Sequence, residues 1–249
     1  MDVEGKADNP WFEEWFDTRF YHVLYQHRDD QEAQLFIDSL FESLRPQADW
    51  HILDLACGRG RHARYIQKKG VEVTGLDLAD SNIEYASQFL ENKLHFRVAD
   101  MRENYGENKF DLILNLFTSF GYFDTWEDNL RALKQVKRAL KPGGFFLIDF
   151  LNVNMVKDQL IPNEEVNVEG YKFYISRSIG DGRILKKIDL VEPDGTEHHF
   201  KEEVWALAQN DFEALFRQSG LELIDSFGSY KMTKFAPHKS ERLILLARA

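Results

Sequence analysis

The stretch that decides the fold is residues 50–66, WHILDLACGRGRHARYI. A short apolar run leads into Asp54, a loop with Gly58 and Gly60 follows, and a polar segment with helical spacing comes next. A strand, a glycine turn and a helix in this order are typical of an open parallel sheet, where ligands bind beyond the carboxyl ends of the strands. Glycine lets the backbone turn sharply and approach a small molecule closely. The stretch therefore predicts a ligand site as well as a fold class.

Short apolar runs alternate with helical stretches through the first 150 residues or so. The fourth and fifth runs, FDLILNLF and GFFLIDFLN, are almost wholly apolar, as in the middle of a parallel sheet. This alternation implies a parallel sheet covered by helices on both faces. We expect strands at residues 51–56, 71–78, 94–100, 110–117 and 144–152, and helices at residues 61–70, 81–93 and 126–141.

Three other segments depart from this alternation or complete it. Apolar residues at helical spacing predict N-terminal helices at residues 8–25, with Asn9 as cap and Pro10 as first helical residue, and at residues 29–44. After Asn154 the turn signals GDG and EPDGTE separate three expected antiparallel strands, at residues 172–179, 183–191 and 197–207. A helix at residues 210–220 and strands at residues 221–230 and 241–249 follow.

Composition limits the class of protein. The 249 residues are 43% hydrophobic and 29% charged, which is typical of a globular chain, and no apolar run is long enough for a membrane helix. The acidic N-terminus lacks a secretion signal, and the single cysteine, Cys57, fits a reducing compartment, so we expect a cytoplasmic protein. The net charge of −11 argues against a nucleic-acid partner, because such binding is driven by neutralising phosphates.

Three acidic residues lie at or near the ends of the first three expected strands. Asp54 is near the end of the first, Asp77 near that of the second and Asp100 at that of the third. Their loops would meet at one edge of the sheet. A carboxylate can accept hydrogen bonds from two ribose hydroxyls or from an adenine amino group. The pattern therefore predicts a nucleoside that carries a charged tail.

Two cofactor classes fit this arrangement. The segment GRGRHA matches G-x-G-x-x-A, a pattern of nicotinamide cofactor sites, and it keeps a dehydrogenase open as an alternative. Asp54 argues the other way, because its carboxylate would lie where a dinucleotide places its pyrophosphate. The same carboxylate suits an ammonium group, and an amino acid joined to adenosine describes S-adenosylmethionine. A non-catalytic, cofactor-binding regulator is a third possibility.

The sequence resembles the class I S-adenosylmethionine-dependent methyltransferases of the small-molecule type. The resemblance rests on LDLACGRGR, VTGLDL, RVADM, FDLILNLFTSFGYF and LKPGGFFLIDF. It implies an α/β, Rossmann-like fold with a seven-stranded, mostly parallel sheet and helices on both faces, to which the residue patterns above add an antiparallel β insertion after the fifth strand and N-terminal helices. It also implies S-adenosyl-L-methionine contacts from Asp54, Ala56, Gly58, Gly60, Asp77, Leu78, Asp100, Met101, Asn115 and Leu116.

One domain over residues 1–249 would then have four parts. Residues 1–46 form a helical cap, residues 47–154 the cofactor-binding core, residues 155–208 a β-rich substrate lid, and residues 209–249 the end of the core. Where methylases of base amines and glutamine amides carry an Asn/Asp-Pro-Pro-aromatic turn, this chain has Asn115, Leu116, Phe117 and Thr118. We therefore expect a small-molecule substrate, in a monomer or homodimer that requires no metal.

Residues for the acceptor side follow from the expected lid and cap. Tyr122 is a candidate for the pocket wall, and Arg177 and His198 are candidates within the insertion. Tyr174, His199 and Trp205 of the insertion are further candidates for substrate contact. His198 and His199 cannot face the same side, because strand side chains alternate. From the N-terminal segment we expect Tyr21, with Tyr25 and Arg28, to close over the cofactor.

Overall fold

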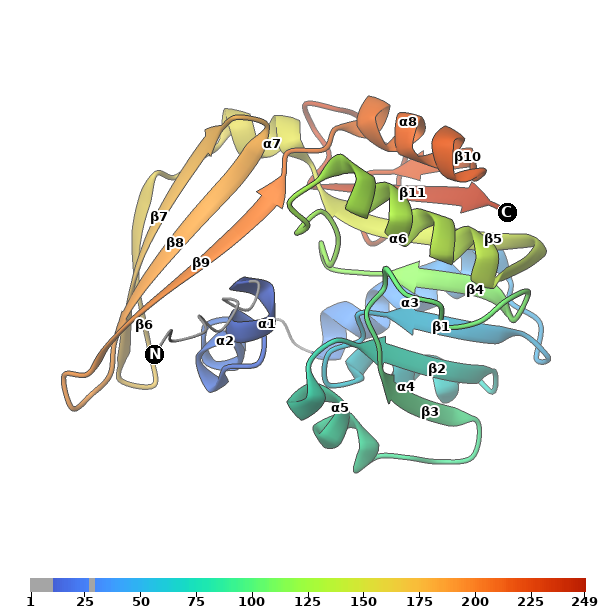
Figure 1. Cartoon of the computed structure of the whole chain (residues 1–249), viewed down its shortest axis with the longest axis horizontal. Coiled ribbons are helices and arrows are strands. Elements are labelled where there is room, and N and C mark those ends of the chain that lie inside the picture. Colours follow the sequence, from blue (N-terminus) through green and yellow to red (C-terminus); the bar gives the residue numbers. More distant parts are fainter. Residues whose placement is uncertain (1–10, 27–29) are drawn as a thin grey trace, which may run out of the picture.

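Seven strands form the central sheet in the order β10-β11-β5-β4-β1-β2-β3 (Figure 1). The computed structural model describes residues 11–26 and 30–249. In chain order, the strands of this sheet are β1 (His51–Leu55), β2 (Glu72–Asp77), β3 (Leu94–Val98), β4 (Phe110–Asn115), β5 (Leu140–Leu151), β10 (Glu222–Phe227) and β11 (Arg242–Arg248). β1 and β4 lie in the middle with almost fully buried side chains, as their apolar runs predict.

The strand order reverses between β1 and β4, which pair in parallel. The pairs β1–β2, β2–β3 and β4–β5 are also parallel, whereas β11 is antiparallel to both β5 and β10. The predicted Rossmann-like, seven-stranded and mostly parallel sheet is confirmed, and its last strand in the chain, β11, is antiparallel to both neighbours. Loops that leave β1 and β4 in opposite directions open a crevice at this reversal, and ligands of such sheets bind there.

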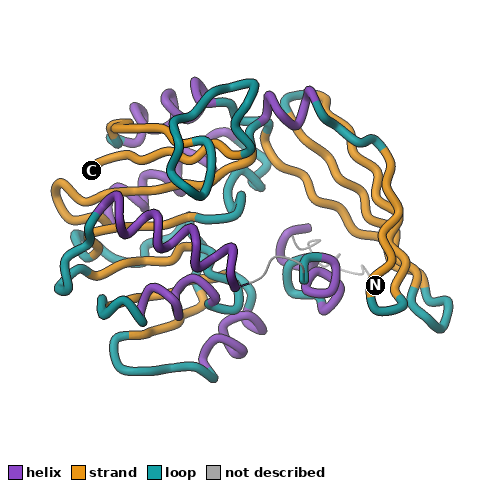
Figure 2. The backbone as a smooth tube through the Cα atoms, turned by 180° about the vertical axis from the view of Figure 1, so that it is seen from behind, coloured by secondary structure: helices purple, strands orange, loops and turns teal. Residues whose placement is uncertain are grey.

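Helices cover both faces of the sheet (Figure 2). On one face, α3 (Asp30–Leu44) and α4 (Arg61–Gln67) pack against Ile52, Leu112 and Leu147. On the other, α6 (Trp126–Ala139) and α8 (Gln209–Ser219) pack against Leu53, Ile113 and Phe146. α5 (Asp80–Ser87) lies against β2 and β3. Alternate residues of each central strand thus enter opposite halves of the core.

α6 shows why such a segment is helical. Thr125 caps it by accepting a hydrogen bond from the Asp128 N–H at 3.1 Å. Glu127 and Asp128 lie in the first turn, and Lys137 and Arg138 in the last, so both ends complement the helix dipole. Its apolar stripe, with Leu133 and Val136, is buried. The helix ends at Ala139, ahead of Pro142.

A second, antiparallel sheet follows β5 and stands apart from the core in Figure 1. We call it the lid sheet; it consists of β6 (Asn163–Val168), β7 (Tyr171–Gly180), β8 (Arg183–Val191) and β9 (Glu197–Trp205). Short α7 (Val153–Asp158) connects it to β5. The sequence pattern predicts β7, β8 and β9 but misses β6. β6 is an edge strand with the polar sequence NEEVNV, and pairing with β7 is what holds it in a sheet.

The first two helices pack on the lid sheet. This N-terminal helix pair, α1 (Trp11–Trp15) and α2 (Arg19–Leu24), shares a separate apolar cluster with β7, β8 and β9. Trp15, Phe20 and Leu24 are buried there against Phe173 and Ile188. By contrast, α3 packs on the central sheet, so the helix pair and α3 lie in two different layers. The expected first helix is broken at residues 16–18, and its cap, Asn9 and Pro10, lies outside the described residues.

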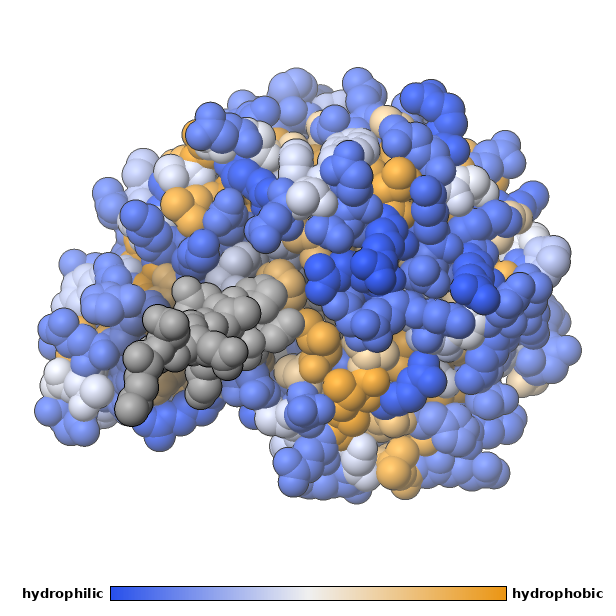
Figure 3. All heavy atoms as spheres, viewed as in Figure 1, coloured by the Kyte–Doolittle hydropathy of each residue, from blue (hydrophilic) through white to orange (hydrophobic). Residues whose placement is uncertain are grey.

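The surface is mostly hydrophilic. On the face shown in Figure 3, hydrophilic atoms predominate and hydrophobic atoms gather in the region of α5. In residues 11–26 and 30–249, no helix has both the length and the apolar character needed to cross a membrane.

Candidate active site

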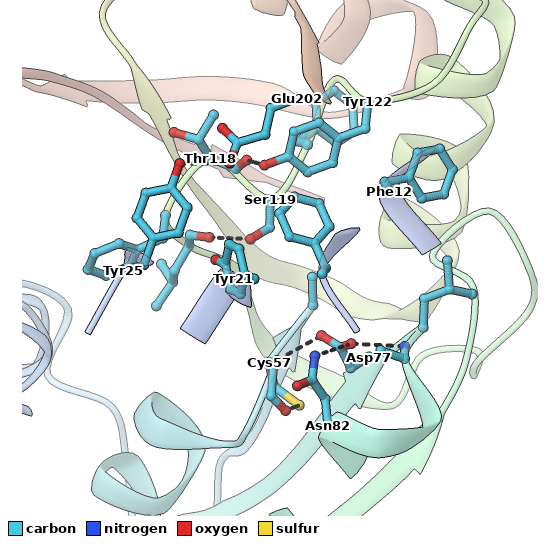
Figure 4. Close-up of a pocket in the computed structure, with 18 of the residues that line it drawn as sticks. Phe12, Tyr21, Tyr25, Cys57, Asp77, Asn82, Thr118, Ser119, Tyr122 and Glu202 are labelled. Atoms are coloured by element: carbon cyan, nitrogen blue, oxygen red, sulfur yellow. Dashed lines mark hydrogen bonds between the residues drawn. The ribbon is translucent and has the colours of Figure 1, made fainter. Parts of the chain in front are cut away.

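A cavity of about 990 Å³ lies between the central sheet, the N-terminal helix pair and the lid sheet (Figure 4). One end, which we call the core end, is formed by loops that follow β1 and β2 and includes Asp54, Asp77 and Asn82. The opposite end, the lid end, includes Tyr25 and Glu202. The loop after β4 forms a wall between the two ends, with Thr118 and Ser119.

Asp54 is a buried carboxylate at the core end. It is 1% exposed, and its Oδ2 accepts a hydrogen bond from the Ala63 backbone N–H at 3.1 Å, in the first turn of α4. Burial, together with the nearby charge of Asp77, raises the pKa of Asp54 to about 7. Because burial outweighs the Ala63 N–H and the charge of Arg61, a ligand that carries positive charge would favour the ionised form of Asp54.

The two glycines of the loop after β1 have different roles. Gly58 lines the cavity at φ +54°, and a Cβ there would meet no described atom within 4 Å. Gly60 caps α4 at φ +76°, and a Cβ there would lie 2.6 Å from the Phe96 ring. Gly60 is not among the cavity-lining residues. Gly58 therefore leaves room for a ligand, whereas Gly60 lets α4 begin close to β3.

Cys57 lies beneath this loop. A Cβ on Gly75 of β2 would be 2.8 Å from its sulfur, so the thiol fills the space that this glycine leaves. Burial, with Asp54 and Asp77 nearby, raises the pKa of the Cys57 thiol well above its usual value. The close packing of Cys57 is that of a structural residue, and its raised pKa disfavours the thiolate that a nucleophile needs.

Asp77 lies where β2 ends, at the centre of a hydrogen-bond cluster. It accepts from the Gly58 N–H at 2.7 Å, from the Ala79 N–H at 3.0 Å and from the Asn82 side chain at 3.3 Å (Figure 4). Burial still raises its pKa. These donors hold the carboxylate in one orientation at the cavity wall, next to Leu78 and to His22 of α2, whose pKa burial lowers to about 4.

Asp100 lines the cavity beyond β3, next to Met101. The Arg102 guanidinium binds both of its carboxylate oxygens, with Nε–O distances of 3.0 Å. Burial favours the neutral acid, but the bonds from Arg102 outweigh it and lower the pKa of Asp100. The carboxylate therefore stays ionised and keeps only part of its accepting capacity for a ligand.

The loop after β4 is held by buried polar groups. Asn115 donates to the Leu55 carbonyl at 3.0 Å and to the Ser119 carbonyl at 3.2 Å, so it ties β1 to the loop. Leu116 lines the cavity, but Asn115 does not. The next residues, Phe117 and Thr118, have φ values of +59° and +61°, which side chains other than glycine rarely adopt.

Asp149 of β5 stabilises this unusual turn. Its carboxylate accepts from the Phe117 N–H at 2.9 Å and from Arg242 Nε at 2.7 Å, and its carbonyl accepts from the Thr118 N–H at 2.9 Å. Arg242 also donates to the Thr118 hydroxyl at 2.9 Å, and Tyr230 donates to Asp149 at 3.2 Å. Strained turns of this kind persist where the surroundings over-determine them, often at functional sites.

Similarity to known proteins agrees with this geometry. A family model for a methyltransferase domain matches residues 52–144. YqeM of Bacillus subtilis (strain 168), which has a provisional methyltransferase name, is 39% identical over 101 residues, covering 39% of this chain and 41% of that protein. The dTDP-3-amino-3,4,6-trideoxy-alpha-D-glucopyranose N,N-dimethyltransferase of Streptomyces venezuelae is 27% identical over 213 residues, 82% of this chain and 89% of that enzyme.

A solved S-adenosylmethionine-dependent methyltransferase from Clostridium acetobutylicum ATCC 824 has the same fold. Its TM-score is 0.77 at 22% identity, and the match covers 92% of this chain and 96% of that one. This chain is a class I S-adenosylmethionine-dependent methyltransferase. S-adenosylmethionine is therefore its cofactor, and the dehydrogenase and regulator alternatives have no such support.

Some of the residues predicted from the lid and the cap line the cavity of the methyltransferase, and others do not. Tyr21 and Tyr122 line the cavity, and Tyr122 donates its hydroxyl hydrogen to the Thr118 carbonyl (Figure 4). Arg177 also lines it and pairs with Glu164 at 2.6 Å. Arg28 lies outside the described residues.

His198 lies away from the cavity. It does not line the cavity; it pairs with Glu192 at 2.7 Å, and its ring packs 4.7 Å from that of Phe20. His198 faces the inner side of the lid sheet but at the end far from the core, where α2 covers it. His199 points outward and pairs with Asp189. Tyr174 and Trp205 are also absent from the cavity lining, and Trp205 donates to the Phe123 carbonyl at 2.7 Å.

Among the charged residues of the cavity wall of this methyltransferase that sequence reasoning missed are Lys186, Glu202 and Arg242. A signal for the first was present. In RILKKIDLV the apolar residues Ile184, Ile188 and Leu190 alternate, and Lys186 occupies a position of the same face. In the part of the chain that the structure describes, no three His, Cys, Asp or Glu side chains are grouped to hold a metal ion.

Proposed function

We propose that this methyltransferase moves the methyl group of S-adenosylmethionine to a small molecule bound at the lid end of the cavity. The observation that carries the proposal is the continuity of the cavity from Asp77 to Glu202. Its volume, about 990 Å³, is at the upper end of the range for small-molecule sites and has room for a cofactor and an acceptor. The lid sheet and the helix pair form further walls of the cavity, which favours an acceptor small enough to lie between them and the core.

The core end has groups that suit the cofactor. We assign the ribose hydroxyls to Asp77, whose orientation the Gly58 and Ala79 N–H groups fix. The buried carboxylate of Asp54 suits the ammonium group, and the open space at Gly58 suits the amino-acid tail. Ala56, Leu78, Met101 and Leu116 would supply the remaining contacts, and Asp100 would accept from the adenine amino group.

S-adenosylmethionine supplies a methyl group that is bound to a positively charged sulfur. When the methyl group is transferred, the sulfur leaves as the neutral thioether of S-adenosylhomocysteine, which is a good leaving group. The chain therefore has to orient the acceptor in line with that methyl group and to exclude water. The wall formed by Leu116, Phe120 and Phe123 keeps the region between the two ends apolar. Tyr122 and Thr118 place oxygen atoms beside it, where they can orient an acceptor amine or hydroxyl.

The composition of the chain supports a cytoplasmic location and a substrate other than nucleic acid. The net charge of −11 disfavours nucleic acid as substrate, and the single buried Cys57 suits a reducing cytoplasm. The relative from Streptomyces venezuelae acts, by its name, on an amino sugar joined to dTDP. That name supports an acceptor of comparable size for this chain.

Thermal unfolding with separate additions of S-adenosylmethionine, S-adenosylhomocysteine, NAD and NADP tests the cofactor. A ligand at about 100 times its dissociation constant adds about 2.7 kcal/mol to the free energy of unfolding, which raises Tm by roughly 5–10 °C. We expect this shift with the two adenosyl ligands alone. Release of S-adenosylhomocysteine with pooled small amines and alcohols then tests transfer. A shift with NAD alone, or transfer only to proteins, would contradict the proposal.

A further inference from the structure

The inner face of the lid sheet carries a row of charged side chains. Arg177 of β7 pairs in register with Lys186 of β8, which pairs with Glu202 of β9. All three line the cavity. Because residues in register lie on the same face with Cβ atoms about 5 Å apart, the row forms one continuous polar strip across the lid end.

Apolar rows flank this strip on both sides. Ile175, Ile188 and Phe200 are in register on the side that the helix pair covers, and Ile179, Ile184 and Val204 on the other side. Charged residues on a buried sheet face cost free energy unless they are paired. Lys186 and Glu202 have only 13% and 20% of their side chains exposed. The strip therefore gives an otherwise apolar inner face a set of charged groups that an acceptor in the cavity can reach.

The charges along the strip are ordered. Glu164 pairs with Arg177 at one end, at 2.6 Å. At the other end Glu202 accepts from Tyr25 at 2.7 Å and from Trp15 at 2.9 Å. The two cations adjoin in the middle, with Lys186 3.7 Å from Glu202 and donating to the Tyr25 hydroxyl. Like charges in register repel, and an anion between them would relieve that repulsion.

We propose that Arg177 and Lys186 bind an anionic group of the methyl acceptor, a carboxylate or a phosphate. The guanidinium presents parallel N–H donors that match either group, and the lysine ammonium adds a point charge. The anionic group would lie against the lid sheet, and the nucleophile would then extend toward the core end. This inference rests on the proposed function, because it assigns the acceptor to the same cavity.

The test titrates acetate and inorganic phosphate separately into the protein at constant ionic strength, with and without S-adenosylhomocysteine, by calorimetry. The variants are Lys186→Met and Arg177→Met. The matched control is Lys187→Met, because Lys187 follows in β8 but is exposed on the opposite face. Arms with the two anions distinguish a carboxylate site from a phosphate site.

We expect saturable binding of one of the anions to the native protein and to Lys187→Met, and binding at least about tenfold weaker to the other two variants. Affinity for S-adenosylhomocysteine should be the same in all four proteins. The inference is overturned if neither anion saturates the native protein, or if Lys186→Met binds as tightly as Lys187→Met. Failure of the native protein to bind S-adenosylhomocysteine would instead count against the proposed function. The titrations without S-adenosylhomocysteine measure the affinity for the anion independently of that result.

Discussion

At the scale of single residues, Asp77 offers the most direct test of the cofactor site. Its carboxylate is oriented by three donors and faces the cavity. We expect Asp77→Ala to weaken S-adenosylhomocysteine binding by roughly tenfold to a hundredfold, since a hydrogen bond to a charged group contributes about 1.5–3 kcal/mol. Calorimetry measures this, with Asp49→Ala on the exposed turn before β1 as control. Equal affinities of the two variants for S-adenosylhomocysteine would show that Asp77 does not contact the cofactor.

Asp54 should make cofactor binding depend on pH. Its pKa is about 7 in the protein without cofactor, so the carboxyl group is protonated at lower pH. An ammonium group favours the ionised form, so binding releases a proton from Asp54. The dissociation constant should therefore rise by up to about tenfold for each pH unit below about pH 7, and level off above it.

This pH dependence can be separated from that of other groups. His22 and His62, with pKa values of about 4 and about 3, stay neutral across the window. We expect Asp54→Asn to bind with an affinity that changes little between about pH 5.5 and about pH 8. Calorimetric titrations with S-adenosylhomocysteine across this range measure both proteins. A native protein as insensitive to pH as the variant would show that Asp54 does not pair with the ammonium group.

At the scale of elements, the start of α4 depends on Gly60. Alanine there must adopt φ +76° and also place its Cβ 2.6 Å from Phe96. Gly58→Ala is the matched variant, because it has positive φ but open space. The left-handed conformation costs roughly 1–2 kcal/mol in either variant, and Gly60→Ala adds the collision. Thermal unfolding without cofactor should give a clearly lower Tm for Gly60→Ala; equal values would mean that Phe96 moves aside freely.

The loop after β4 depends on the buried pair of Asp149 and Arg242. Asp149→Ala leaves Arg242 without its main anionic partner, and the Phe117 N–H loses its acceptor. We expect the free energy of unfolding to fall by about 3–5 kcal/mol. The double variant Asp149→Leu/Arg242→Met should be more stable than Asp149→Ala, because no charge is left buried. Urea unfolding measures both, and a double variant less stable than Asp149→Ala would contradict this account.

At the scale of the whole molecule, the two apolar cores predict two units of stability. Phe173 is fully buried in the cluster that joins the helix pair to the lid sheet, and Phe146 is buried in the core. We expect Phe173→Ala to speed amide hydrogen exchange in α1, α2 and β7–β9 while β4 stays protected, because stability is not uniform across a structure. Phe146→Ala is the control and should affect β4 and β5. Equal acceleration of β4 in both variants would mean that the cores unfold together.

Sequence alone predicts the core well, because its signals are local. Apolar runs, helical spacing and glycine turns report on their own neighbours, so the order of strands and helices from His51 to Leu151 follows from them. The acidic strand ends placed Asp54, Asp77 and Asp100 at one cavity for the same reason, since parallel strands bring their carboxyl ends to one edge. Even Gly58 and Gly60 were recognised, although the structure gives them different roles.

What only the tertiary structure decided concerns pairing across long separations. His198 and Glu202 lie on the same face of β9, yet α2 covers one while the cavity exposes the other, and no local pattern distinguishes them. The polar strand β6 exists because β7 pairs with it. The strip of Arg177, Lys186 and Glu202 arises from register across three strands. Local sequence sets each strand's faces, but the free energy that selects the partner is that of the assembled core.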